Sequence, residues 1–294
     1  MKTVTGFSKM SKTEKIQWLA SHFEGKSQEE IMGMSRFWNQ NPAEQQRFDE
    51  FAENTLTNYY LPFGVAPNFL INGQTHAIPM VIEESSVVAA ASLAAKFWST
   101  RGGFHSRVIS TIKLGHVHFL WKGDKGRLEE FFAGVRPALI EGVSFLTANM
   151  AKRGGGLLSL ELVDMTHELA DYWQLKLRFE TCDAMGANFI NSVLEETARL
   201  LKLRLHTSDL PEAEREADVI MCILSNFTPE CLVECHVECA VDELGTFADG
   251  MNAQTFAQRF YTAVRIARID SSRAVTHNKG IMNGVDAVII ATGN

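Results

Sequence analysis

Residues 157–180 read LLSLELVDMTHELADYWQLKLRFE, two apolar runs separated by a polar connection. The runs LLSLELV and YWQLKLRFE predict two short strands that pair with each other. The triple glycine Gly154-Gly155-Gly156 directly before them predicts a flexible turn into the first strand.

The flanking segments extend this pair in both directions. Before it, residues 106–121 predict a strand that is broken near Gly115, and residues 127–151 predict a helix. After it, a helix is expected from about residue 186 to residue 203, and DVIMCIL (218–224) predicts a closing strand. The order is β-α-β-β-α-β, which is the ferredoxin-like split βαβ arrangement.

The chain length leaves room for a second domain around this unit. The 294 residues correspond to about two domains. We therefore expect an α/β (α+β) protein in which residues 105–224 are inserted into a larger domain. Residues 1–104 begin that domain, and residues 225–294 resume it.

Composition excludes several classes of protein. The formal net charge of −7 argues against a nucleic-acid-binding protein. The N-terminus has no signal-peptide run, and no stretch reaches about 18 apolar residues, so no membrane association is expected. Five cysteines, an odd number in a long chain, predict a reducing, cytoplasmic setting.

Helix-start signals are dense near the N-terminus. Ser11 and Glu14 have capping-box spacing, and Ser27 and Glu30 repeat it. Asn41-Pro42 predicts the start of a long polar helix that reaches about Tyr60.

A predicted hairpin at Asn72-Gly73 leads to Glu83-Glu84-Ser85-Ser86 and an Ala-rich helix that Arg101-Gly102-Gly103 ends. Two acids before a helix usually only favour its positive end. The small residues behind them, however, would permit close packing and desolvation. Desolvation raises the pKa of a carboxyl group and would make a general acid available.

The last segment, residues 271–294, predicts a loop followed by a buried helix. Thr276 to Gly280 (THNKG) allows two interpretations, a capped helix start with a surface lysine, or a lysine at a helix N-terminus that stabilises an oxyanion.

Other candidate sites carry weaker signals. Asp183 to Asn188 (DAMGAN) follows a strand and opens a helix, where phosphate binds well, but it is not GxGxxG. Cys231, Cys235, His236 and Cys239 lack paired CxxC spacing, so a buried strand face is favoured over a metal site. His116 and His118 are expected to be structural.

Several of these segments together resemble class II 3-hydroxy-3-methylglutaryl-coenzyme A (HMG-CoA) reductases. Residues 83–92 resemble the family's EEPSVVAAAS segment, with Ser85 in place of proline. Residues 183–188 match its dinucleotide signature DAMGAN, and residues 273–284 match its catalytic-lysine segment, RAVTHNKGIMNG. Residues 53–69 resemble the segment that contributes to the family's dimer.

The resemblance implies a fold and an activity. It implies a large HMG-CoA-binding domain with an inserted NAD(P)-binding domain, and a homodimer or higher homo-oligomer. The activity would be oxidoreduction between HMG-CoA and mevalonate plus coenzyme A with two NADH or NADPH, without a metal. Physiological direction is not implied.

The resemblance also assigns roles to individual residues. Lys279 would polarise the thioester carbonyl, and Glu84 would handle protons at the substrate oxygen. The HMG group would be held by Ser86, Arg273 and Asn283. Asn226 would lie near the nicotinamide. The cofactor would be lined by Asp183, Met185, Gly186, Ala187 and Asn188. Arg273 can pair with a carboxylate in a two-pronged contact that lysine cannot reproduce.

Two departures from the family pattern qualify these assignments. Ser159 occupies the position of the acid found in NAD-preferring members, which leaves NADPH open. Lys152 and Arg153 lie nearby in sequence. The family motif continues beyond Asn294 with an aspartate that keeps the lysine charged and then with a C-terminal flap, so we expect little or no turnover by the 294 residues alone. Two alternatives to an HMG-CoA reductase stay open. One is an inactive paralogue that binds a CoA ester or dinucleotide or only dimerises, and the other is a cysteine-metal protein.

Overall fold

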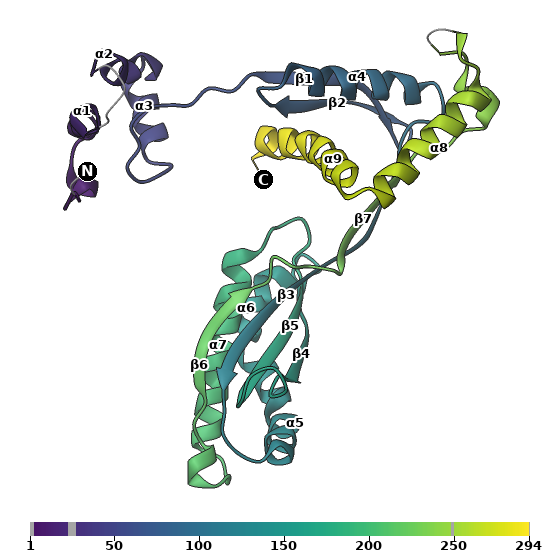
Figure 1. The fold of residues 1–294 in the computed structure, drawn as a ribbon. Coiled ribbons are helices and arrows are strands. Elements are labelled where there is room, and N and C mark those ends of the chain that lie inside the picture. The colour runs from purple at the N-terminus through teal and green to yellow at the C-terminus, as the bar shows by residue number, and fades with distance from the viewer. Residues whose placement is uncertain (1–2, 23–27, 248–249, 294) are drawn as a thin grey trace. The chain divides into compact units, whose positions relative to one another are not determined.

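The computed structural model describes residues 3–22, 28–247 and 250–293, and it divides into two compact units (Figure 1). One unit contains Met1–Gly103 and Glu238–Asn294, and the other contains Phe104–Val237. The chain is a mixed α/β protein, which confirms the predicted fold class.

The unit of residues 104–237 is built on an antiparallel sheet with the strand order β4-β5-β3-β6, and β7 pairs with the first half of β3. The elements run in the predicted β-α-β-β-α-β order, with the first helix in two pieces. They are β3 (His105–Leu120), α5 (Lys125–Gly142), α6 (Ser144–Ala151), β4 (Gly156–Asp164), β5 (Tyr172–Glu180), α7 (Ala187–His206), the 3-10 turn η3 (Glu212–Glu214), β6 (Asp218–Leu224) and β7 (Cys231–His236).

The core of this unit lies between the sheet and its three helices. Alternate residues of β5 point into it, and Trp173, Leu175, Leu177 and Phe179 are at most 2% exposed. The helix α7 supplies the other side of this core, with seven buried residues spaced along one face. Period-two burial on the strand and helical spacing on α7 explain why these sequences form these elements.

The strand β3 is continuous, so the predicted break at Gly115 is wrong. A Cβ at Gly115 would lie 2.8 Å from Ile190 Cγ2 and 2.8 Å from Leu194 Cδ1. The glycine therefore lets α7 pack closely against the strand and does not interrupt the strand.

The predicted helix over residues 127–151 is bent by 56° where α5 meets α6. Val143, between the two helices, is 1% exposed, so the bend keeps an apolar side chain in the core. Within the described chain no single helix is long and apolar enough to cross a membrane, and this bent pair meets the length and composition criteria only when its two helices are combined.

The compact unit extends to Val237, beyond Leu224, because β7 pairs with β3 from His105 to Thr111. The expected buried cysteine face of this strand is wrong. Val233 is 68% exposed, Cys235 is exposed, and the strand ends before Cys239. All five cysteines are free thiols.

The other unit contains the predicted hairpin. Strands β1 (Phe63–Ile71) and β2 (Gln74–Val81) are joined by Asn72 and Gly73, which have φ of 49° and 80°. Positive φ at both positions is what a tight hairpin turn requires. Helix α4 (Ser85–Ser99) packs on β1, and α9 (Ser271–Thr292) packs on β2 and on α8 (Ala253–Ile269).

The last segment differs from its prediction. Asp270 caps α9 by accepting hydrogen bonds from the backbone N–H groups of Ser272 and Arg273, so the helix begins at Ser271 without the expected loop. Among the described residues of α9, only Ala287 is fully buried, so the expected buried helix is also wrong.

The N-terminal residues form α1 (Lys12–His22), α2 (Gln28–Met32) and α3 (Pro42–Asp49), with the 3-10 turns η1 (Phe7–Lys9) and η2 (Gly33–Phe37). The capping box is confirmed, since Ser11 and Glu14 exchange hydrogen bonds of 2.7 and 3.3 Å. Ser27 lies outside the described residues. Asn41 caps α3 as predicted, but α3 ends at Asp49 and not near Tyr60, and Asn54 has a positive φ of 59°.

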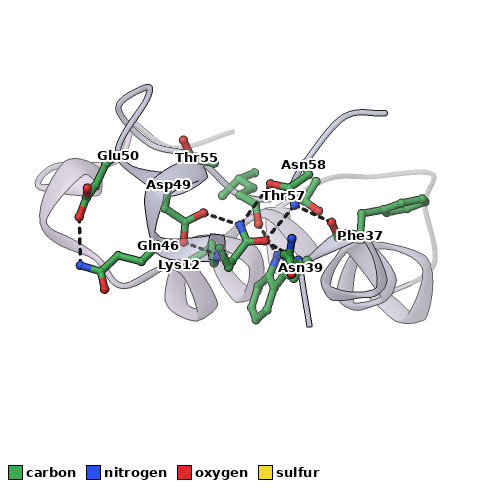
Figure 2. A network of polar contacts seen from close by, with 12 residues as sticks. Lys12, Phe37, Asn39, Gln46, Asp49, Glu50, Thr55, Thr57 and Asn58 are labelled. Carbon is green, nitrogen blue, oxygen red and sulfur yellow. Dashed lines mark hydrogen bonds and ion pairs between the residues drawn. The ribbon is translucent and has the colours of Figure 1, made fainter. Parts of the chain in front are cut away.

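A network of polar contacts connects these helices with the segment that follows α3 (Figure 2). Gln45 is only 6% exposed, and its side-chain amide exchanges hydrogen bonds with that of Asn58, at 2.8 and 3.2 Å. The Asn58 amide also donates to the backbone oxygen of Phe37, and Lys12 forms an ion pair with Asp49. The segment after α3 is thus held against the helices by hydrogen bonds.

Candidate active site

Two segments separated by 195 residues meet at the start of α4. Glu84 is the N-cap residue of α4 in extended conformation, and its side chain does not cap the helix. Lys279, Asn283 and Ala287 are four residues apart on α9 and so share one face of that helix. Because Ala287 is buried with Ala66 and Met80 of the hairpin, this face is held against the hairpin.

The carboxylate of Glu84 is the centre of a small polar cluster. Lys279 Nζ donates to Glu84 Oε2 at 3.1 Å, and Asn283 Nδ2 donates to the same oxygen at 3.0 Å. Ser86 Oγ donates to the other oxygen, Oε1, at 3.1 Å. Four residues that the sequence singled out are thus brought together, while Glu83 has no side-chain partner among the described residues.

The electrostatics of Glu84 differ from the sequence-based expectation. The hydrogen bond from Lys279 is the main cause that holds the pKa of Glu84 below its usual range, with Ser86, the charge of Lys279 and Asn283 contributing in the same direction. The expected rise by desolvation is wrong for this state, since the side chain remains 44% exposed. Glu84 is therefore a carboxylate at neutral pH.

Both interpretations of residues 276–280 placed a helix start there, and that placement is wrong. Lys279 is the ninth residue of α9, two turns from its start at Ser271. Its charge is compensated by Glu84 and not opposed by the helix dipole. Arg273 lies in the first turn of α9, and its guanidinium has no partner among the described residues.

In the other unit, residues 183–186 lie in the expected turn between β5 and α7, and Ala187 and Asn188 begin α7. Gly186 is the N-cap of α7 with φ of 80°, and a Cβ there would lie 2.7 Å from Thr181 Cγ2. No side chain caps the helix, so its first N–H groups are free to bind a ligand. Thr181 is fully buried and holds the turn by donating to the backbone oxygen of Ala184 at 2.7 Å.

Asn226 lies in the loop after β6, and the last residue of β6 is hydrogen-bonded to the first turns of α7. Asn191 Oδ1 accepts a hydrogen bond of 3.0 Å from the backbone N–H of Leu224. Asn191 and Thr181 position the turn and the loop, and sequence reasoning missed both. No local signal distinguishes either from an ordinary polar residue.

The triple-glycine turn packs against the same region. Cys182 Sγ donates to the backbone oxygen of Arg153 at 3.3 Å, and a Cβ at Gly155 would lie 2.4 Å from the backbone oxygen of Glu180. The residues near the turn therefore include Arg153, which the sequence left unplaced. Ser159 donates to Glu161 at 3.3 Å on β4.

Within the described part of the chain, no group of three or more His, Cys, Asp or Glu side chains could hold a metal ion. His116 and His118 contact each other on β3, and His118 Nδ1 is 2.6 Å from the Tyr172 hydroxyl. Burial lowers the pKa of both imidazoles, which agrees with the structural role expected for them.

Solved structures show the same fold. The chain aligns over 100% of its length with class II 3-hydroxy-3-methylglutaryl-CoA reductase of Streptococcus pneumoniae, with a TM-score of 0.74 and 31% identity. It covers 66% of one such chain and 75% of another, which is bound to NADPH in open conformations.

Sequence comparisons agree. The chain is 30% identical to the 3-hydroxy-3-methylglutaryl-coenzyme A reductase of Archaeoglobus fulgidus over 292 residues, 99% of this chain and 62% of that protein. It is 31% identical over 252 residues to a probable reductase of Borreliella burgdorferi, 84% of this chain and 54% of that protein. The family model for hydroxymethylglutaryl-coenzyme A reductase matches residues 11–294, and the chain belongs to this family. It spans less than two thirds of the length of these two relatives.

Proposed function

We propose that this chain carries the substrate-side catalytic groups of an HMG-CoA reductase. The reaction converts HMG-CoA, two reduced nicotinamide cofactors and two protons to mevalonate, coenzyme A and two oxidised cofactors, and it is reversible. The observation that carries the proposal is the cluster of Glu84, Lys279, Asn283 and Ser86.

The role of Lys279 follows from its contact. A thioester carbonyl oxygen that took the place of Glu84 Oε2 would accept the same hydrogen bond from the ammonium group. That contact would polarise the carbonyl and stabilise negative charge on its oxygen as hydride is added to the carbon.

The role of Glu84 follows from the cause of its low pKa. If the substrate oxygen takes over the hydrogen bond from Lys279, Glu84 loses the main cause that lowers its pKa. The pKa then rises, and Glu84 can take up a proton and deliver it to the substrate oxygen. Ser86 and Asn283 are within reach of the same oxygens. Arg273, whose guanidinium has no partner among the residues that the structure describes, would bind the carboxylate of the HMG group.

The turn at residues 183–188 fits a dinucleotide. Gly186 keeps the approach to the uncapped start of α7 free of a side chain, and the backbone N–H groups there would bind phosphate. Asp183, Met185, Ala187 and Asn188 would line the cofactor, with Asn226 near the nicotinamide. The bound cofactor supplies the hydride.

Both NADH and NADPH are proposed as cofactors. Ser159 presents no negative charge to a 2′-phosphate, and Arg153 lies beside the cofactor turn through its contact with Cys182. An acid at this place would repel the phosphate, so its replacement leaves NADPH acceptable.

A homodimer or higher homo-oligomer in a reducing, cytoplasmic setting completes the proposal. Phe51, Tyr59 and Tyr60 are 80%, 85% and 63% exposed, and such a concentration of exposed aromatic side chains is typical of an interface. Five free thiols fit a reducing compartment.

The test is HMG-CoA-dependent oxidation of NADH or NADPH by the protein as produced in its own cells, with matched variants. Lys279→Met and Glu84→Gln should each lower kcat by about 100-fold or more. Glu83→Gln is the control and should keep nearly normal kcat, because Glu83 lies beside the cluster without joining it. Equal losses in Glu83→Gln and Glu84→Gln would overturn the assignment. Tight HMG-CoA binding without any cofactor oxidation would favour the inactive paralogue.

A further inference from the structure

A second candidate ligand site lies at the far end of the 104–237 unit from the cofactor turn. It is a pocket of about 860 Å³ at the end of β3, the last turns of α7 and the start of β6. It is lined by Leu120, Lys122, Lys202, Leu203, His206, Ala213, Arg215, Glu216, Ala217 and Asp218. At 1.5 Å per residue, Lys202 is roughly 20 Å along α7 from Ala187, so this pocket is distinct from the cofactor turn.

The wall formed by residues 213–217 is firmly held. Trp121 is 2% exposed, and its Nε1 donates to the backbone oxygen of Glu214 at 2.7 Å. The Glu214 carboxylate accepts from Arg127 Nε at 2.9 Å and from the backbone N–H of Asp124 at 3.3 Å. A Cβ at Gly123 would lie 2.4 Å from Trp121 and 2.7 Å from Glu214, so the loop and the end of β3 are closely packed. A pocket with a fixed wall is preorganised for a ligand.

The charges that line the pocket are unpaired. Lys122, Lys202 and Arg215 form no ion pair within the described residues, and neither do Glu216 and Asp218. Arg215 is anchored through Nε, which donates to the backbone oxygen of Leu210 at 2.7 Å, so the rest of its guanidinium is available. Three cations against two carboxylates leave the lining with a net positive charge, which favours an anionic ligand.

The other lining groups narrow the chemistry of that anion. Leu120 and Leu203 offer apolar surface for a flat ring, and the carboxylates of Glu216 and Asp218 can accept hydrogen bonds from a sugar diol. A nucleoside phosphate has all three parts, and the volume falls within the usual range of about 300–1,000 Å³ for small-molecule sites. We propose that the pocket at the C-terminal end of α7 binds a nucleoside phosphate, separately from the dinucleotide of the reductase reaction.

Calorimetric titration with adenosine 5′-monophosphate tests this proposal. The Lys122→Ser/Lys202→Ser variant removes two cations whose side chains form no hydrogen bond or ion pair within the described fold, and it should weaken binding tenfold or more. Arg204→Ser is the matched control, since Arg204 is an exposed cation on the same helix that does not line the pocket. It should leave the affinity unchanged, and circular dichroism should show the same helix content in all three proteins.

Three further measurements define the ligand class and the location. Inorganic phosphate and adenosine should each bind at least tenfold more weakly than the monophosphate, and saturating NADPH should not displace it. The proposal is overturned by no binding at millimolar nucleotide, by equal affinity in the double variant, by phosphate binding as tightly as nucleotide, or by competitive displacement with NADPH.

Discussion

Replacing Gly115 by alanine tests whether the close contact between β3 and α7 is required. The added Cβ would lie 2.8 Å from Ile190 and from Leu194, against about 3.5–4.0 Å for an ordinary carbon contact. Ile190 and Leu194 are 1% and 0% exposed, so neither side chain can move into solvent.

The magnitude follows from two opposing effects. Overpacking a filled core costs about 1–3 kcal/mol. The lower backbone entropy of alanine in the unfolded chain returns about 0.5–1 kcal/mol. We expect Gly115→Ala to destabilise the 104–237 unit by about 0.5–2 kcal/mol.

Native-state hydrogen exchange measures this energy within one unit of a two-unit chain. The most protected amides of β3 and α7 should exchange roughly 2- to 30-fold faster in the variant. The contact lies just after the turn of residues 183–186, so the proposed binding of NADPH should weaken as well. Gly134→Ala is the matched control in the same unit. A Cβ at Gly134 meets nothing within 4 Å in the helix α5, so alanine should slow exchange there and stabilise by about 0.5–1 kcal/mol. Unchanged or slower exchange in Gly115→Ala would refute the reasoning.

Three further changes test other parts of the molecule. Hydrogen bonds from Lys125 and Thr166 hold the pKa of Asp164 far below its usual range. Its ionised form therefore stabilises the fold above pH about 4, and this contribution is lost as the pH falls through the folded-state pKa. The Tm difference between wild type and Asp164→Asn should shrink between pH 5 and pH 2.5 (about the span of acid titration), and a constant difference would contradict this prediction. Gln45→Ala should destabilise the N-terminal helices by about 1–3 kcal/mol in urea unfolding, because Asn58 loses its buried amide partner, whereas Gln46→Ala, whose side chain is exposed, should have little effect. Gly280→Ala should raise the Tm, because a Cβ there meets nothing within 4 Å and alanine favours a helix by about 1 kcal/mol; a lower Tm would show that this face of α9 is covered.

Sequence patterns predicted elements whose determinants are local. The hairpin at Asn72-Gly73 needs two positive φ angles, and the capping box at Ser11 and Glu14 needs only four residues. The order of strands and helices around residues 157–180 followed from apolar runs that match the buried positions of β5. These signals act over a few residues, and here the tertiary contacts favour the same elements as the local signals.

The errors arose where a distant contact decided the outcome. Gly115 was interpreted as a break because a glycine weakens an isolated strand, whereas its role depends on Ile190 and Leu194, more than 70 residues away in sequence. The start of α9 is an exception with a local cause, because Asp270 caps the helix and begins it before the predicted loop ends. The end of α3 at Asp49 depends on packing of the following segment through Asn58, which no local pattern reveals.

The candidate site shows the same division between local and distant causes. Glu84 could be selected from its place before Ser85 and Ser86, but its protonation state could not, because that state depends on Lys279 and Asn283 from the other end of the sequence. Small residues in α4 allow close packing along the helix, yet Glu84 lies at its open end, where water and an ammonium group both stabilise the carboxylate. A carboxylate held in this way cannot donate a proton until its partner is drawn away. Under the proposed function, a ligand oxygen that accepts the hydrogen bond from Lys279 would also make the acid available, and substrate binding would be coupled to proton delivery through one hydrogen bond.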